Sequence, residues 1–175
     1  MLDIVAQAIG VAAAAMNILS YQFKKNRVLY LFQLCGTMLF AVSFTMLGSY
    51  TAAAINVITF VRNAFLAKGG VFEKTPFLCL ILAATVVSTV LTYSGLPSIL
   101  ILVAMVIQSL TVWTRNGKIL RYGQFFVSSP CWIVHNSINF SLGGLIADCF
   151  VMLSIIVSFI RYGKDGFEGT KKIKQ

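Results

Sequence analysis

The stretch TPFLCLILAATVVSTVLTYSGLPSILILVAMVIQSLTVWT, residues 75–114, contains no lysine or arginine and is almost entirely apolar. It is about twice as long as the ~20 residues that a helix needs to cross a bilayer. A stretch of this length fits two membrane spans joined by a short neutral turn. The sequence therefore predicts a pair of transmembrane helices here.

The same pattern recurs along the chain, since residues 28–61 and 122–160 also lack lysine and arginine. The first 23 residues fit one more span, which makes seven. The basic residues gather in four clusters between these stretches: Lys24, Lys25 and Arg27; Arg62, Lys68 and Lys74; Arg115, Lys118 and Arg121; Arg161, Lys164, Lys171, Lys172 and Lys174. Positive charge collects on the cytoplasmic side of membrane proteins, and seven spans place all four clusters on one side. We therefore expect an external N-terminus and a cytoplasmic C-terminus.

Composition supports a membrane protein. The chain is 58% hydrophobic and 11% charged, with a mean hydropathy of +0.87, whereas a soluble domain carries about a quarter charged residues. The net charge of +9 is explained by loops that face the cytoplasm and anionic lipid, so the expected partner is the lipid bilayer and not nucleic acid. The four cysteines lie in predicted spans and form no CxxC pair, so we expect small buried apolar groups rather than disulfides.

The boundaries of the spans follow from the charge clusters and from glycine-containing turns. We expect helices near residues 3–22, 28–47, 50–67, 76–94, 97–115, 120–141 and 144–162. Outer turns are expected at Gly48-Ser49-Tyr50, Ser94-Gly95-Leu96 and Ser141-Leu142-Gly143, each of which contains a glycine. Pro97 suits the first turn of a helix, and Pro130 lies in mid-span, where it should kink the sixth helix.

Seven spans suggest a duplication in a 3-1-3 arrangement, with two three-helix bundles and a linker helix. The first bundle is expected over residues 1–68, the linker over 69–96, the second bundle over 97–163 and a mobile cytoplasmic tail over 164–175. A shift of 92 residues aligns Phe40 with Trp132 and Asn56 with Asp148. An odd linker makes the two triplets parallel, as in transporters with parallel repeats.

Ionisable residues within membrane spans are rare and often functional. Apart from the clustered arginines and Asp3 at the start of the first span, the predicted spans contain two, His135 and Asp148, and both lie about six residues in from an outer turn. Asn56 lies at the same depth on the third span. These three residues are expected to line one cavity.

The sixth span carries the longest polar stripe. Gln124, Ser128, Trp132, His135 and Asn139 share one face at about 100° per residue, and Asn136 flanks it. The stripe is either hydrogen-bonding between packed helices or one wall of a hydrated path, with Trp132 as a stacking surface. The sequence leaves both interpretations open.

Asp148 is interpreted either as a buried acid paired with His135 or as a proton-coupling group. Cys131 and His135 are spaced as a metal pair, but only Asp148 offers a third ligand and no fourth is in view, so no metal is expected. The sequence holds no paired intramembrane aspartates, no Ser/His dyad and no HExxH motif. We therefore expect no catalytic residues, no cofactor and no enzymatic activity.

Cys131-Trp132-Ile133-Val134-His135-Asn136, followed by Gly143-Gly144 and by Phe159-Ile160-Arg161 at the end of the last span, resembles the YgjV family of bacterial inner-membrane proteins. The resemblance is clearest over residues 96–167, and it implies a multi-pass protein of the bacterial inner membrane. That family is distantly similar to the SWEET and PQ-loop transporters, which share the 3-1-3 layout. The similarity implies that Trp132, Asn56 and Asp148 face a substrate, although Asp148 stands where an Asn is expected and no Pro-Gln pair occurs.

The expected function is therefore transport of a small molecule by alternating access. The expected substrate-binding residues are Asn56, Trp132, His135, Asn136 and Asp148. The alternative is a membrane sensor or accessory protein that transports nothing and uses the polar stripe for packing. The sequence does not identify the substrate or the coupling ion, and it leaves open whether the protein forms a homo-oligomer.

Overall fold

The computed structural model describes residues 2–70, 74–163 and 166–169, and the regular structure within these ranges is helical. The helices are α1 (Leu2–Ser20), α2 (Asn26–Met46), α3 (Tyr50–Lys68), α4 (Thr75–Leu91), α5 (Leu96–Trp113), α6 (Gly117–Gly123), α7 (Ser129–Ile138) and α8 (Leu142–Tyr162), with a π-helical segment η2 (Gln124–Ser128) between α6 and α7. Because α6, η2 and α7 follow one another without a break, they form a single rod. The described residues thus contain seven rods, with ends within three residues of those expected.

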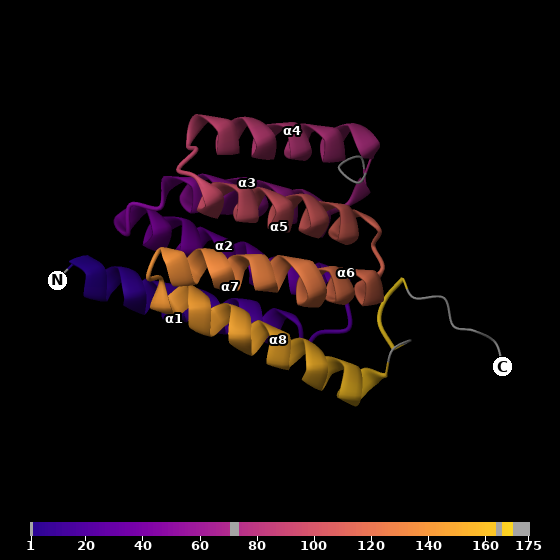
Figure 1. Cartoon of the computed structure of the whole chain (residues 1–175). Helices are drawn as coiled ribbons and strands as arrows, with labels where there is room; N and C mark the ends of the chain where they lie inside the picture. Colours follow the sequence, from indigo (N-terminus) through magenta and orange to yellow (C-terminus); the bar gives the residue numbers. More distant parts are fainter. Residues whose placement is uncertain (1, 71–73, 164–165, 170–175) are drawn as a thin grey trace.

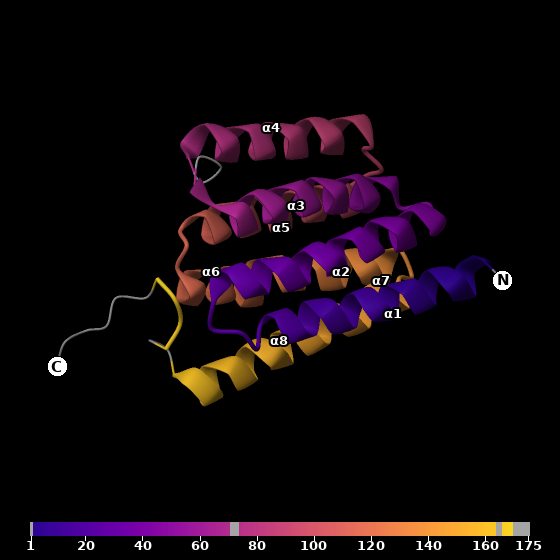
Figure 2. The same cartoon turned by 180° about the vertical axis from the view of Figure 1, so that it is seen from behind.

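The rods lie side by side in two layers, with α1, α2 and α3 in one and α5, α6–η2–α7 and α8 in the other (Figures 1 and 2). α1 packs against α8 and α3 against α5, so the layers meet along both edges. α4 lies outside both layers, where it contacts α3 and α5.

The α1–α2 and α5–α6 connections, the end of α3, the start of α4 and the end of α8 lie at one end of the rods, which we call the basic end (Figure 1). The start of α1 and the other three connections lie at the opposite, neutral end. The described residues of the four basic clusters therefore gather toward one end of the molecule, as the positive-inside rule requires of a membrane protein.

Four helices, α2, α3, α5 and α8, are long and apolar enough to cross a membrane, and the described parts of α1 and α4 are shorter apolar helices. The exposed side of α4 is apolar, with Leu80, Val87, Val90 and Leu91 more than half exposed. Only Ile81, Thr85 and Thr89 of α4 are buried. This distribution is that of a helix that faces lipid.

Two of the three predicted outer turns are confirmed. Gly48 and Gly95 adopt φ values of 72° and 96°, which glycine accepts without strain. The third turn lies slightly earlier than the expected Ser141-Leu142-Gly143: the chain reverses at Phe140, with φ 52°, Ser141 is the N-cap of α8, and Gly143 lies inside that helix. An ideal Cβ on Gly143 would lie 3.2–3.3 Å from backbone atoms of Gly10 and Val11, so Gly143 is needed for the close approach of α8 to α1.

Pro97 lies in the first turn of α5, as predicted. Pro130 lies in the first turn of α7, directly after η2. Ser129 N–H bonds to Gln124 O, five residues back, so the helix widens by one residue immediately before the proline. π-helical turns of this kind are frequent at functional sites.

The tail expected over residues 164–175 lies mostly outside the described residues. Its described part, 166–169, docks onto the basic end. Phe167 is 3% exposed, and Glu168 Oε2 accepts a hydrogen bond of 2.6 Å from Asn26 N. The described part of the tail is therefore packed, in contrast to the mobile segment expected.

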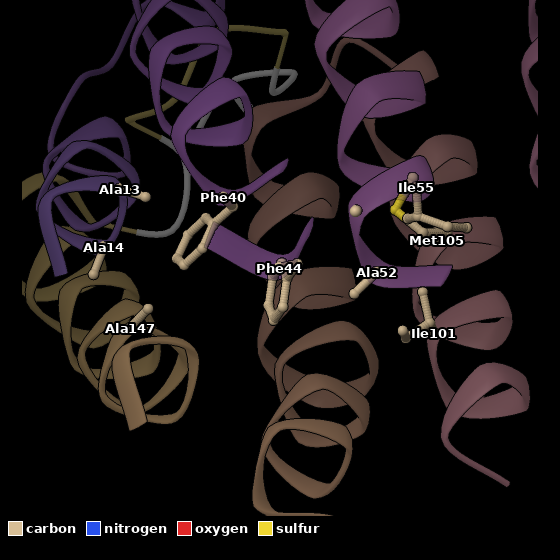
Figure 3. Packing of buried hydrophobic residues seen from close by; sticks show 10 residues of the cluster. Ala13, Ala14, Phe40, Phe44, Ala52, Ile55, Ile101, Met105 and Ala147 are labelled. Carbon is tan, nitrogen blue, oxygen red and sulfur yellow. The ribbon is translucent and has the colours of Figure 1, made fainter. Parts of the chain in front are cut away.

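Two apolar clusters fill the interior. The first includes Phe40, Phe44, Ile101, Met105 and Ala147, and Figure 3 shows Phe40 and Phe44 between the alanines of α1 and α8 on one side and Ala52 and Ile101 on the other. The second includes Tyr21, Tyr30, Leu66, Leu120 and Ile155. Members of both clusters also border a polar cavity, so the fold places that cavity between them.

Candidate functional site

A cavity of about 70 Å³ lies inside the bundle. Every rod except α4 contributes to its wall, so it is central to the two layers. Its lining residues are Asn17, Tyr21, Gln33, Thr37, Phe40, Phe44, Asn56, Thr59, Met105, Gln108, Gln124, Trp132, Asn136, Gly144, Ala147, Asp148 and Val151. Water needs about 10–15 Å³ of such space, so the cavity has room for several water molecules or one very small solute.

Four of the five residues expected to bind substrate line this cavity: Asn56 on α3, Trp132 and Asn136 on α7, and Asp148 on α8. The structure thus brings together residues from three spans, as the sequence predicted. Whether they contact a substrate stays a prediction.

His135 does not line the cavity. It is 2% exposed, its Nδ1 lies 3.2 Å from Pro97 O of α5, and its ring meets that of Trp132 edge-on, with centroids 5.5 Å apart. Two residues that are three positions apart differ by about 300° around a helix, which equals about 60° in the opposite direction. His135 therefore faces α5, whereas Trp132 faces the cavity. The expectation that His135 and Asp148 line one cavity is wrong.

Asp148 is held by an amide rather than by His135 or Asn56. Asn136 Nδ2 donates a hydrogen bond of 2.9 Å to Asp148 Oδ2. An ionised carboxylate only accepts hydrogen bonds, so the Asn136 amide must turn its nitrogen toward Asp148. Its oxygen then lies against Gly144, whose ideal Cβ would be 2.6 Å away.

Several lining residues were not singled out from the sequence, or were assigned to packing. Asn17, Tyr21, Gln33, Thr37 and Gln108 all line the cavity without having been identified as site residues from the sequence. A glutamine at position 33, inside an apolar stretch, was the available signal. Its Nε2 donates to the hydroxyl of Tyr21 at 3.2 Å, which joins α2 to the end of α1.

The largest departure from expectation concerns two arginines. We counted two ionisable residues within the spans, but Arg62 on α3 and Arg121 on α6 also lie inside the helical bundle, and both are 0% exposed. Both had been assigned to the basic clusters of the loops. A clustered arginine near a span end gives no sign in the sequence that it folds inward.

Neutral oxygens bind both guanidinium groups. Arg62 donates to Ser109 Oγ at 3.0 Å, to Asn63 Oδ1 at 3.2 and 3.3 Å and to Gln108 Oε1 at 3.4 Å. Gln108 in turn donates to Gln124 Oε1 at 2.9 Å. A hydrogen-bonded chain therefore connects Arg62 to two residues of the cavity wall.

Arg121 joins four separate segments. It donates to Tyr21 O, Phe23 O and Gly117 O at 2.9–3.0 Å and to Ser158 Oγ at 3.2 Å. Its guanidinium carbon also lies 3.9 Å from the centroid of the Phe167 ring. These contacts hold the α1–α2 connection, α6, α8 and the docked tail together at the basic end.

Lining residues also recur at a constant spacing. Four pairs stand 92 residues apart, the spacing of the proposed duplication, and both members of each pair line the cavity: Phe40 and Trp132, Phe44 and Asn136, Asn56 and Asp148, Thr59 and Val151. The 3-1-3 arrangement itself stays a prediction. No three His, Cys, Asp or Glu side chains are grouped to hold a metal ion in residues 2–70, 74–163 and 166–169.

Comparison with known proteins gave one finding. The family model Imp-YgjV, described as a bacterial inner membrane protein, matches residues 4–165. Neither the curated proteins nor the solved structures contain a significant match.

Proposed function

We propose that this chain, which belongs to the Imp-YgjV family of bacterial inner membrane proteins, transports a small molecule by alternating access. The observation that carries the proposal is the central cavity, to which six of the seven rods contribute polar or aromatic side chains. Polar groups inside a membrane protein are costly, and packed protein interiors contain few voids larger than a water molecule. A polar cavity with room for a solute is what a transporter needs at mid-membrane.

The layout supports a two-part mechanism. The proposed halves, residues 1–68 and 97–163, supply opposite walls of the cavity, and the linker helix α4 takes no part in it. The four lining pairs spaced 92 residues apart favour parallel repeats, which in other transporters rock against each other around a central site. The cavity of this chain would then open alternately toward each end.

The contacts at the basic end suit a closed gate. Arg62 of the first half bonds to α5 of the second, and Arg121 of the second half bonds to the α1–α2 connection of the first. Opening toward the basic end requires both sets of hydrogen bonds to break. Because neutral oxygens accept them, breaking them leaves no carboxylate unpaired.

The neutral end is closed by packing. Gly10 of α1 and Gly143 of α8 are in close contact, and Gly143 N–H donates to Gln7 Oε1 at 3.1 Å. Phe44 of α2 stacks on Trp132 of α7, with centroids 6.0 Å apart. Both contacts join the two proposed halves, so opening toward the neutral end requires them to separate.

The test needs no knowledge of the substrate. In a background with Cys35, Cys79, Cys131 and Cys149 replaced by alanine, Thr37→Cys places one thiol in the cavity wall. A small membrane-impermeant methanethiosulfonate is applied to right-side-out and to inside-out vesicles. Alternating access predicts labelling of Thr37→Cys from both sides.

Two matched controls calibrate the labelling. Val90→Cys on the exposed face of α4 should be shielded by lipid in both vesicle types, and Tyr93→Cys at the neutral end should react from one side only. If Thr37→Cys reacts from neither side, or from one side only, the transporter proposal is refuted. The alternative, a sensor or accessory protein, then takes its place.

A further inference from the structure

We propose that the cavity binds a small organic cation with an N–H-donating ammonium group, for which Asp148 is the counter-ion. This inference rests on the proposed function and names the substrate class of the same site. It follows from the charge of the wall, from its hydrogen-bonding groups, from its aromatic faces and from its size.

Charge comes first. Among the described residues of the wall, Asp148 is the one Asp, Glu, Lys or Arg, and an ammonium ion beside it would stabilise its ionised, negative form. Arg62 and Arg121 are nearby cations, but their N–H groups donate to protein oxygens. A ligand in the cavity therefore meets a carboxylate directly, whereas a carboxylate ligand would have to displace Gln108 to reach Arg62.

The hydrogen-bonding groups point the same way. The amide nitrogens of Asn56, Gln33, Gln108, Gln124 and Asn136 each donate to a protein oxygen. The hydroxyls of the lining threonines likewise donate to backbone carbonyls of their own helices. These amides and hydroxyls therefore donate within the protein, whereas Asn17, Tyr21 and Trp132 donate no side-chain hydrogen bond to the residues that the structure describes.

Two acceptors of the wall lack a donor. The buried amide oxygens of Gln33 and Asn136 accept no hydrogen bond from the residues that the structure describes. Their partial negative charges are not offset by a donor and add to that of Asp148. A ligand that suits such a wall donates hydrogen bonds and carries positive charge, and an ammonium group offers three donors and no acceptor.

Aromatic side chains form the apolar part of the wall. Phe40, Phe44 and Trp132 line the cavity, and their rings follow one another with centroid distances of 5.7 and 6.0 Å. Aromatic faces attract cations through the ring quadrupole. The same surfaces suit a short alkyl chain attached to the ammonium group.

Size limits the chain length. Pockets for drug-sized ligands measure about 300–1,000 Å³, whereas this cavity measures about 70 Å³. The substrate class is therefore a primary amine with few carbon atoms.

The experiment compares three solutes of nearly equal shape: n-propylammonium, 1-propanol and propionate. The chain has two tryptophans, Trp113 and Trp132, so Trp113→Phe leaves Trp132 as a fluorescent reporter in the cavity wall. The protein is titrated in lipid nanodiscs. We expect a saturable change with n-propylammonium and at least tenfold weaker binding of the alcohol and the carboxylate.

Two variants complete the test. Asp148→Asn should weaken n-propylammonium binding at least tenfold, whereas Glu168→Gln, which removes a negative charge outside the cavity, should leave it unchanged. Equal binding of 1-propanol, tighter binding of propionate, no response to any solute or no effect of Asp148→Asn would each overturn the inference. The charge series on the parent protein decides the question even if Asp148→Asn fails to fold.

The two proposals fail separately. Labelling of Thr37→Cys from both sides, together with no preference for the ammonium ion, leaves a transporter with another class of substrate. Ammonium binding without two-sided labelling indicates an amine-binding membrane protein that does not transport.

Discussion

Replacement of Gly144 by alanine should displace the amide that holds Asp148. An ideal Cβ on Gly144 lies 2.6 Å from Asn136 Oδ1 and 2.7 Å from both Cγ and Nδ2. Ordinary contact begins at 3.4 Å, so the amide must retreat by about 0.8 Å. Asn136 then loses its 2.9 Å hydrogen bond to Asp148, because bonds beyond about 3.5 Å contribute little.

The magnitude follows from three terms. Loss of a hydrogen bond to a charged acceptor costs about 1.5–3 kcal/mol, and overpacking costs about 1–3 kcal/mol. Alanine in a helix interior is favoured over glycine by about 1 kcal/mol. The net expectation for Gly144→Ala is a loss of about 2–4 kcal/mol in the free energy of unfolding.

Gly10→Ala is the graded control, because its Cβ would meet the hydroxyl of Ser43 at 3.1 Å. That contact needs a shift of only a few tenths of an ångström, which the gain of about 1 kcal/mol in helix propensity offsets. Reversible denaturant unfolding in bicelles should place Gly10→Ala within about 1 kcal/mol of the parent protein.

A double-mutant cycle isolates the clash. Asn136→Ala removes the obstructing amide, so Gly144→Ala should cost almost nothing in that background. The expected interaction free energy is about 2–4 kcal/mol, because it is the difference between the cost of Gly144→Ala in the two backgrounds. The reasoning is refuted if the two substitutions are additive, or if Gly144→Ala is as stable as Gly10→Ala.

Three further predictions concern the basic end, the topology and the repeats. Arg121→Lys should lower the free energy of unfolding by about 2–4 kcal/mol, because an ammonium cannot reach four separated acceptors and leaves buried oxygens unpaired. The control Arg27→Lys, at an exposed position, should change it by less than about 0.5 kcal/mol. Equal effects of the two substitutions would contradict the role of Arg121 in joining four segments. A reporter fused after Gln175 should be active only in the cytoplasm, and periplasmic activity would remove the seven-span topology. In an experimental structure, residues 1–68 should superpose on 97–163 with Phe40 and Trp132 in equivalent places; different places would mean that the spacing of 92 residues is a coincidence.

The helices and their ends could be predicted closely. The expected spans end within three residues of the helices because the preference of an apolar stretch for lipid depends mainly on its own composition. The lipid-facing character of α4 could be predicted for the same reason. The position of the last outer turn could not be predicted closely. Gly143 belongs to α8 and not to the turn because it contacts Gly10 of α1, and the sequence does not show that α1 and α8 are neighbours.

The candidate site could be predicted in part. Asn56, Trp132, Asn136 and Asp148 were identified as polar or aromatic groups inside spans, and they line the cavity. His135 was misplaced because the sequence gives the spacing of residues on a helix but not the rotation of that helix against its neighbours. The pairing of Asp148 with His135, which the sequence left open, gives way to the hydrogen bond from Asn136 for the same reason.

The sequence by itself determined that the chain is a bundle of membrane-spanning helices with its basic clusters at one end. The length of an apolar stretch and the charge of a loop depend on that segment alone and not on its contacts with other segments. Only the tertiary structure decided that Arg62 and Arg121 turn inward and join the two proposed halves, and that Asn136 rather than His135 holds Asp148. An arginine near a helix end can point outward to water or inward to carbonyl and amide oxygens. Its direction depends on whether distant segments place acceptor oxygens within about 3 Å of the guanidinium nitrogens. Those acceptors exist only when the bundle has packed.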